Sequence, residues 1–267
     1  MGYRNLRYRV IMLLGRLTRP FERWRIFTRR DSALTTAGHV IPVNARLETG
    51  AHVVLPMAVL EPLIRSASHV AIMRECLCRR GEGCREHPVS TGCLLLGDAV
   101  EDLDPGLGSR VTADEAVRHA LGALGEGLFP LVVHNSFDAW MWGIPYRRMM
   151  NICFCCDCCC TVRRIISERI STGFIENTFR LPGVTVRVLD SCTGCGACES
   201  SCMAHAILSN GVRARIDDSL CKGCGRCASL CPSNAIEVLI ESPSEAASGL
   251  MKLYGARSRV GFDDGGG

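Results

Sequence analysis

The sequence contains few aromatic residues and no long hydrophobic run. Phe, Tyr and Trp together make up 6% of the 267 residues. The apolar stretches Val10 to Leu14 and Ala51 to Leu60 are far shorter than the roughly 20 residues of a membrane-spanning helix. The first of them ends in Arg16 and no small-residue cleavage site follows, so we expect no secretory signal.

Familiar enzyme and nucleic-acid motifs are also missing. The sequence has no Gly-rich nucleotide fingerprint and no Ser/His/Asp pattern that would indicate a separate active site. No motif of a DNA- or RNA-binding domain accompanies the arginines, so nucleic acid is not an expected partner. The residue type that remains to carry chemistry is cysteine, with 18 copies.

The net charge of +4 conceals a strong asymmetry. Residues 1–30 hold nine arginines and a single acidic residue, Glu22, which gives this arm a charge of +8 and the remainder −4. Its apolar residues recur at spacings of four and three, as in an amphipathic helix: Leu6, Val10, Leu14, Leu17, Phe21 and Trp24. Such a helix lies on an anionic membrane surface, docks on an acidic partner or packs on its own body, and the sequence leaves the three open.

The cysteines fall into four clumps, which favours metal binding over disulfides. Secreted disulfide scaffolds are small and spread their cysteines along the chain, whereas clumped cysteines in a longer chain indicate metal ligands. Thiolate ligands must stay reduced. We therefore expect a cytoplasmic protein that works at low oxygen, with peripheral attachment at the cytoplasmic face of the membrane as one use of the arm.

The last two clumps are two copies of the pattern C-x2-C-x2-C-x3-C. This spacing is typical of segments that bind [4Fe–4S] cubanes, with the fourth cysteine of each run ligating the other cluster. Glycines inside both runs allow the tight turns that the ligands need. The eight residues are Cys192, Cys195, Cys198, Cys202, Cys221, Cys224, Cys227 and Cys231.

This region resembles the two-cluster bacterial ferredoxins. The resemblance implies two [4Fe–4S] clusters, the first on Cys192, Cys195, Cys198 and Cys231 and the second on Cys221, Cys224, Cys227 and Cys202. Pro232 follows the second run as in that family, but Met203 stands where the family has the corresponding proline. Structural zinc is the alternative metal, although zinc sites usually take two cysteines from each of two knuckles.

The first two clumps lie upstream and are less regular. One is set in a polar loop and the other places six cysteines in eight residues, too close together for an unstrained disulfide network. We expect a strand to Phe154 that turns into a helix, which would divide the six thiols among different faces. These ten cysteines are the predicted ligands of one or two further iron–sulfur clusters: Cys76, Cys78, Cys84, Cys93, Cys153, Cys155, Cys156, Cys158, Cys159 and Cys160.

The combination CLCR…C…C with a later CFCCxCCC is similar to the cysteine-rich front half of a group of bacterial and archaeal proteins known only as ferredoxins. This resemblance covers roughly residues 50–165. It implies that the two upstream clumps belong to one unit, and it brings no established activity with it.

The predicted fold class is α+β: a C-terminal ferredoxin-like bicluster module and an N-terminal mixed α/β cysteine-rich domain. The expected boundaries are an arm at 1–30, the cysteine-rich domain at 31–180, the ferredoxin domain at 181–241 and a flexible tail at 242–267. Within the front domain we expect a strand over 39–47, a helix over 55–67 and a helix that begins with the capping box of Thr112 and Glu115. The buried stripe of that last helix is predicted to be Val117, Leu121 and Leu124.

These features predict an iron–sulfur electron-transfer protein or subunit that serves a flavoprotein or another oxidoreductase partner. The catalytic step would then lie in that partner. One alternative is a redox enzyme whose front-half centre binds a substrate, since ten cysteines exceed the needs of two cubanes by two. A second alternative is a metal-sensing or zinc-storage module.

Overall fold

The computed structural model describes residues 37–47, 55–167 and 176–262. The predicted basic arm at 1–30 lies outside these ranges. The strands are β1 (Ala37–Val40), β2 (Arg46–Leu47), β3 (Val70–Met73), β4 (Leu94–Leu96), β5 (Gly108–Val111), β6 (Phe129–His134), β7 (Met150–Cys155), β8 (Thr178–Arg180), β9 (Val184–Val188), β10 (Ile207–Ser209), β11 (Ala214–Ile216) and β12 (Ile236–Ile240). The helices are α3 (Leu55–Ser66), α4 (Leu77–Glu82), α5 (Ala113–Gly125), α6 (Ser136–Trp142), α7 (Thr161–Ser167), α9 (Ala197–Ser201), α10 (Arg226–Leu230) and α11 (Pro243–Gly255), with 3-10 turns η1 (Asp98–Asp102) and η2 (Tyr146–Arg148).

The front half is built on a seven-stranded sheet with the order β5-β3-β4-β7-β6-β1-β8. Its neighbouring strands pair antiparallel, except for β1 and β8, which are parallel. The central strands β6 and β7 have the longest register, from Phe129 opposite Cys155 to Val133 opposite Asn151. Helices and strands thus mix as the α+β prediction requires.

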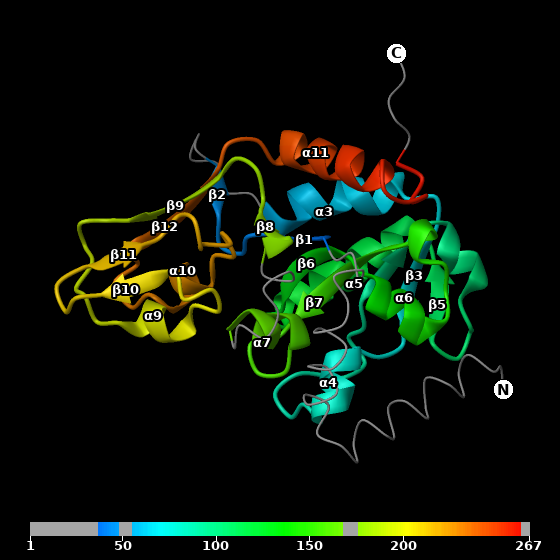
Figure 1. The fold of residues 1–267 in the computed structure, drawn as a ribbon, viewed down its shortest axis with the longest axis horizontal. Coiled ribbons are helices and arrows are strands. Elements are labelled where there is room, and N and C mark those ends of the chain that lie inside the picture. Colours follow the sequence, from blue (N-terminus) through cyan, green and yellow to red (C-terminus); the bar gives the residue numbers. More distant parts are fainter. Residues whose placement is uncertain (1–36, 48–54, 168–175, 263–267) are drawn as a thin grey trace.

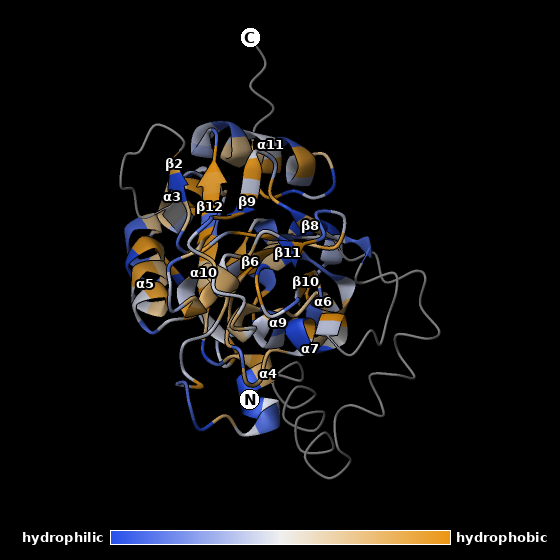
Figure 2. Cartoon of the chain, turned by 90° about the vertical axis from the view of Figure 1, so that its left-hand side faces the viewer, coloured by the Kyte–Doolittle hydropathy of each residue, from blue (hydrophilic) through white to orange (hydrophobic). Residues whose placement is uncertain are grey.

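The two faces of this sheet are covered by different helices. On one face α3, α5 and α11 share a core with the sheet residues Val132, Ile152 and Phe154. On the other face α6 buries Trp142 against Leu95. In Figure 1 α3 and α11 run side by side, and in Figure 2 β6 and β12 are largely orange, as expected of strands that face a core.

Alternation along β7 sends neighbouring cysteines to opposite faces, as the sequence predicts for this segment. Phe154 and Cys156 belong to the core under α3 and α5. Cys153 and Cys155 belong to the cores on the other face. Successive side chains of a strand point to opposite sides of the sheet, so this one strand divides the thiols between two environments.

Helix α5 begins as predicted and buries a different stripe from the one predicted. The Thr112 side chain accepts a hydrogen bond from the Glu115 N–H at 3.3 Å, and Glu115 Oε2 accepts one from the Thr112 N–H at 2.8 Å. The residues fully buried in α5 are alanines, and Leu121 is 46% exposed. The predicted stripe is therefore wrong for Leu121, because small residues let α5 approach the sheet closely.

The predicted strand over 39–47 is also wrong as a single element. Residues 37–40 pair with β6 and β8, whereas residues 46–47 pair in parallel with β12 in a second, three-stranded sheet. Pro42 and Asn44, which has a φ of 55°, lie in the turn between the two strands. The chain therefore crosses here from one sheet to the other.

The ferredoxin-like module contains β9 to β12 together with α9 and α10. Strands β9 and β12 pair antiparallel and β2 joins them, while β10 and β11 form a separate antiparallel pair. Figure 1 shows this module beside the end of the larger sheet, with α9 and α10 next to each other. Strand β12 lies in the centre of its three-stranded sheet, between β2 and β9.

The prediction of a flexible tail from residue 242 is wrong for residues 243–255, which form α11. The Ser242 hydroxyl caps this helix by accepting a hydrogen bond from the Glu245 N–H at 3.3 Å, and Pro243 occupies its first turn. Leu250 and Tyr254 are buried, and the helix packs on α3. The chain therefore returns to the front domain after the ferredoxin-like module.

None of the helices in the described ranges is long and apolar enough to span a membrane.

Candidate metal centres

The two cysteine runs of the C-terminal module fold as copies of one another. Each run places a glycine with a φ of 76°, Gly196 and Gly225, directly before a short helix, α9 and α10. His205 and Asn234 also occupy corresponding left-handed positions, with φ of 50° and 49°. The sequence repeat is thus a structural repeat, and each copy presents two thiols from a loop, one from within its short helix and one from the residue that follows the helix.

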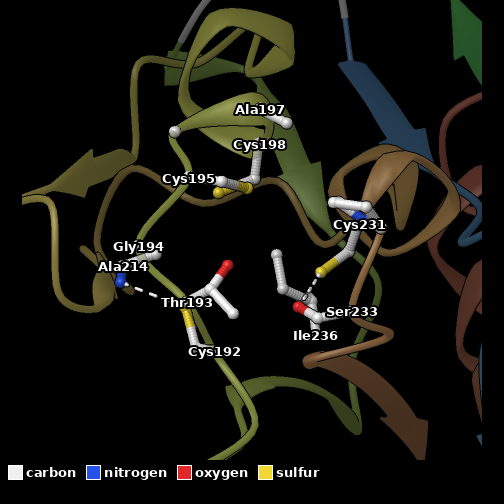
Figure 3. A pocket seen from close by; sticks show the side chains of 12 residues that line it. Cys192, Thr193, Gly194, Cys195, Ala197, Cys198, Ala214, Cys231, Ser233 and Ile236 are labelled. Carbon is white, nitrogen blue, oxygen red and sulfur yellow. Dashed lines mark hydrogen bonds between the residues drawn. The ribbon is translucent and has the colours of Figure 1, made fainter.

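The first predicted ligand set lines one pocket (Figure 3). Cys192, Cys195, Cys198 and Cys231 surround about 280 Å³ of space free of protein atoms, part of it open to solvent. In Figure 3 the Cys231 sulfur approaches from the opposite side to those of Cys195 and Cys198. The fourth thiol therefore comes from the second run, as the resemblance implies.

The second predicted set gathers in the same crossed manner. The Cys227 thiol lies within electrostatic reach of Cys224, Cys221 and Cys202, the last of which comes from the first run. Burial raises the pKa of Cys224 to about 11 and that of Cys227 to about 12. A thiolate at these positions needs a positive partner, and iron or zinc supplies one.

Backbone N–H groups point at several of these sulfurs. Ala206 N lies 3.3 Å from Cys202 Sγ and Ala235 N lies 3.2 Å from Cys231 Sγ, at equivalent places in the two copies. The Ala214 N–H donates to Cys192 Sγ at 3.4 Å. Such donors stabilise the negative charge of thiolates and tune the potential of a cluster that they hold. The donor set therefore fits two [4Fe–4S] clusters.

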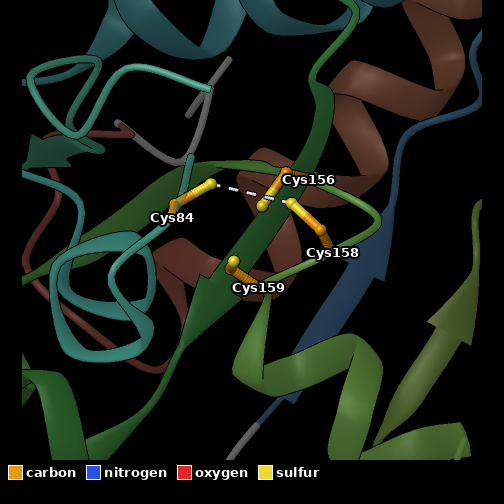
Figure 4. A group of neighbouring side chains, drawn as sticks. All are labelled: Cys84, Cys156, Cys158 and Cys159. Carbon is orange, nitrogen blue, oxygen red and sulfur yellow. Dashed lines mark hydrogen bonds between the residues drawn. The ribbon is translucent and has the colours of Figure 1, made fainter. Parts of the chain in front are cut away.

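Four of the ten upstream thiols converge on one point. The sulfur atoms of Cys84, Cys156, Cys158 and Cys159 all lie within 4.8 Å of one another, and Cys84 and Cys158 are separated by 3.6 Å. Figure 4 shows Cys84 approaching from the α4 side and the other three from the turn after β7. We call these residues the four-thiol group. They offer a complete set of soft ligands for iron or zinc.

The remaining upstream thiols form a second gathering on the other face of the sheet. Cys93 Sγ lies 3.5 Å from Cys153 Sγ, and further side-chain contacts connect the rest in series. We call them the six-thiol group: Cys76, Cys78, Cys93, Cys153, Cys155 and Cys160. The sequence predicted the ten upstream cysteines as ligands without assigning them to separate sites. The fold divides them into groups of four and six.

A buried arginine lies between the two upstream groups. Sequence reasoning placed Arg79 in a polar loop, but its side chain is 0% exposed, because α4 turns it inward. Its Nη1 donates to the Phe154 carbonyl at 2.9 Å, and its charge is attracted by Cys76, Cys93 and Cys156. Arg79 therefore faces thiols of both groups.

The turn after β7 also ties the front domain to the module. Asp157, between two thiols of the four-thiol group, pairs with Arg226 of α10 and with Arg163 Nη1 at 2.8 Å. Arg163 also donates to the Ser201 carbonyl at 3.0 Å. Asp157 is the only charged residue within 153–160, and this feature of the sequence could have indicated the contact.

Two further contacts place the second ligand set of the module against the front domain. The Val43 N–H donates to the Cys224 carbonyl at 3.1 Å, and a Cβ on Gly225 would lie 1.9 Å from the Val43 carbonyl oxygen, so this position requires glycine. Met203 is 4% exposed and shares a core with Cys155 and Cys160. The residue that replaces the family's proline thus packs between the module and the six-thiol group.

The comparison with protein families agrees with the proposed metal site in the part of the chain that it covers. A family model described as a 4Fe-4S dicluster domain matches residues 191–235, which contain all eight cysteines of the module. No curated protein matches the chain. No solved structure matches it either. The match supports iron–sulfur binding in the C-terminal module and covers only that part of the chain.

Proposed function

We propose that this protein relays electrons through several iron–sulfur clusters and exchanges them with a flavoprotein or another oxidoreductase. Two [4Fe–4S] clusters would be held by the crossed cysteine sets of the module, and one or two more centres by the upstream thiols. The observation that carries the proposal is the junction at Asp157 and Met203, which brings upstream thiols beside the second ligand set of the module. Clusters of this type take up and release single electrons.

The chain's own residues supply the conditions for such a relay. Backbone N–H groups stabilise the charge of the module's sulfurs, and Arg79 does so for the upstream groups. Cys198 and Cys227 are buried, whereas Cys195 is exposed. The first ligand set of the module therefore has an edge that a partner can approach, while the second set faces the front domain.

Apolar side chains beside that exposed edge favour a protein partner. Val212, at the tip of the β10–β11 hairpin, is 74% exposed, and Leu208 is 70% exposed. The hairpin lies on the Cys192–Cys195 loop, since a Cβ on Gly194 would meet Val212 backbone atoms at 2.4 Å. Exposed apolar groups close to a redox centre are typical of the small contact surfaces of electron-transfer complexes.

The proposal is tested on protein purified without oxygen. The module alone accounts for about eight irons and eight sulfides per chain, so a relay that includes the front domain requires more than that. In a redox titration followed by EPR, centres other than those of the module should accept electrons. An added oxidised flavoprotein should reoxidise these centres together with the module. An iron content of about eight that no upstream Cys→Ala change lowers would contradict the multi-centre relay.

The close spacing of the four-thiol group also favours a second candidate, a structural zinc ion at that place. Tetrahedral Zn–S bonds of about 2.3 Å place sulfurs about 3.8 Å apart, which is compatible with four sulfurs within 4.8 Å of one another. Metal analysis distinguishes the two: one zinc per chain that Cys159→Ala removes supports a structural ion, and loss of iron and sulfide in the same variant supports a cluster.

We also propose that the basic arm at 1–30 attaches the protein to an acidic partner subunit or to an anionic membrane surface. Its charge of +8 is opposite to that of the rest of the chain. Deletion of residues 1–30 should release the protein from the membrane fraction or from the partner complex at low salt, with its iron content unchanged. An unaltered distribution in both assays would contradict attachment through the arm.

A further inference from the structure

The six-thiol group draws its members from separate parts of the fold. Cys76 and Cys78 come from the start of α4, Cys93 precedes β4, and Cys160 precedes α7. The other two, Cys153 and Cys155, come from β7. Cys76 contacts both Cys78 and Cys93, Cys93 contacts Cys153, and Cys160 contacts both Cys78 and Cys155. The six sulfurs therefore form one continuous series.

This series is separate from the four-thiol group. Cys153 and Cys155 lie on the face of the sheet opposite to Cys156, because β7 alternates. Among the contacts of the described residues, the thiol pairs stay within one group or the other. Two groups of thiols on opposite faces cannot be reached by one metal centre.

The six thiols are also arranged differently from the four. In the described part of the chain only the four-thiol group has its sulfurs all within 4.8 Å of one another. A single ion with metal–sulfur bonds of about 2.3 Å cannot reach a series of six that is spread more widely. Ligation of the whole series requires several metal atoms.

Four of the six thiols are buried and the other two are partly buried, and the site contains a buried positive charge. Cys76, Cys93, Cys155 and Cys160 are between 5% and 8% exposed. Arg79 beside them is fully buried, and within the described residues its Nε has no hydrogen-bond partner and no carboxylate forms an ion pair with it. A buried guanidinium needs a negative partner, and ligating thiolates are the negative groups that it faces.

We propose that the six-thiol group binds a polynuclear iron–sulfur cluster through six thiolates rather than four, and that Arg79 partly neutralises it. The inference rests on the proposed electron-relay function, because it assigns one of the centres of that relay. The burial of four of the thiols and the packing of Met203 against Cys155 and Cys160 place this centre beside the module.

The test replaces each of the six cysteines in turn by alanine in the full-length chain. Oxygen-free native mass spectrometry measures the inorganic iron and sulfide that remain bound, and EPR after dithionite reduction records which signals are left. Each of the six variants should lose or alter the same component. Cys159→Ala in the four-thiol group serves as the matched control and should affect a different component. Retention of the module's signals and of the component that Cys159→Ala affects shows that the module and the front domain have folded in each of the six variants.

Two outcomes overturn the inference in distinguishable ways. If any of the six variants keeps the wild-type iron, sulfide and EPR signals, the centre has fewer than six thiolate ligands, and the relay function stands. If the wild-type chain holds only the module's iron and no upstream variant changes it, the relay through the front domain fails together with this centre.

Discussion

The Asp157 carboxylate pairs with the Arg226 guanidinium and so joins the turn after β7 to helix α10 of the module. The residues on either side of Asp157 belong to the four-thiol group, and Arg226 lies between Cys224 and Cys227. One ion pair therefore connects an upstream thiol site with the second ligand set of the module.

Asp157→Asn should weaken this junction. Removal of the charge leaves Arg226 and Arg163, whose side chains are 19% and 16% exposed, without their carboxylate. We expect the free energy of unfolding in urea to fall by about 1–2 kcal/mol. Asp190→Asn is the matched control, because Asp190 pairs with Arg213 inside the module and its side chain is 99% exposed. Equal effects of the two changes would contradict a special role of the junction.

Arg79→Gln should lower the reduction potentials of the upstream centres. Reduction adds negative charge to a centre, and a nearby buried cation stabilises that charge. Removal of the cation therefore makes reduction harder. We expect a decrease on the order of 50 mV in a redox titration followed by EPR. Arg80→Gln serves as the control, because Arg80 lies next in α4 and pairs with Glu75 instead. A decrease in Arg80→Gln alone would contradict this assignment of Arg79.

Met203→Ala should loosen the packing between the module and the six-thiol group. Met203 is 4% exposed, and truncation of such a side chain costs about 2–3 kcal/mol because a cavity remains. The measurement is urea unfolding, with hydrogen exchange of β7 and α9 as a local readout. Val212→Ala, at a position 74% exposed, should change neither. Unchanged stability of Met203→Ala would mean that the module does not pack on the front domain in solution.

His39 should make the protein sensitive to mild acid. Burial, assisted by the charge of Arg257, lowers the pKa of His39 from 6.5 to about 4 in the folded chain. Below about pH 6.5 the unfolded chain therefore binds a proton that the folded chain does not bind. The free energy of unfolding falls as the pH falls. Between pH 7.5 and 5.5 this amounts to about 1 kcal/mol.

His39→Gln should remove that part of the pH dependence. The measurement is the difference in unfolding free energy between wild type and variant at the two pH values. Burial raises the pKa of Asp138 to about 6 and gives a dependence of opposite sign, but this is common to both proteins and cancels in the difference. Parallel pH curves for the two proteins would contradict the prediction.

The module could be predicted from sequence because metal ligation restricts local geometry. The repeated spacing and the glycines of the loops are local features, and the crossed positions of Cys202 and Cys231 follow the family pattern. The capping box of Thr112 and Glu115 is local in the same way. The spacing, the glycines and the capping box depend on residues close together in the chain, whereas the crossing of the two runs follows from the resemblance.

The division of the upstream cysteines could not be predicted in full, because it depends on strand order. Alternation predicts that Cys155 and Cys156 diverge, but only the pairing of β4 with β7 brings Cys93 to Cys153. The inward turn of Arg79 likewise depends on how α4 sits on the sheet. Helix α11, in contrast, carried a readable signal: Ser242 and Glu245 form a capping pattern ahead of spaced apolar residues.

The return of α11 makes the module an insertion within the front domain. Val184 pairs with Ile240, and the Glu241 N–H donates to the Gly183 carbonyl at 3.1 Å, so the module begins and ends at one place. Tyr254 then reaches His39 of β1, with 3.0 Å between its hydroxyl and Nδ1. Because the ribosome releases the chain from its N-terminus, α11 emerges only after both cysteine runs. During synthesis the front domain therefore keeps the α3 face uncovered until the module has been made.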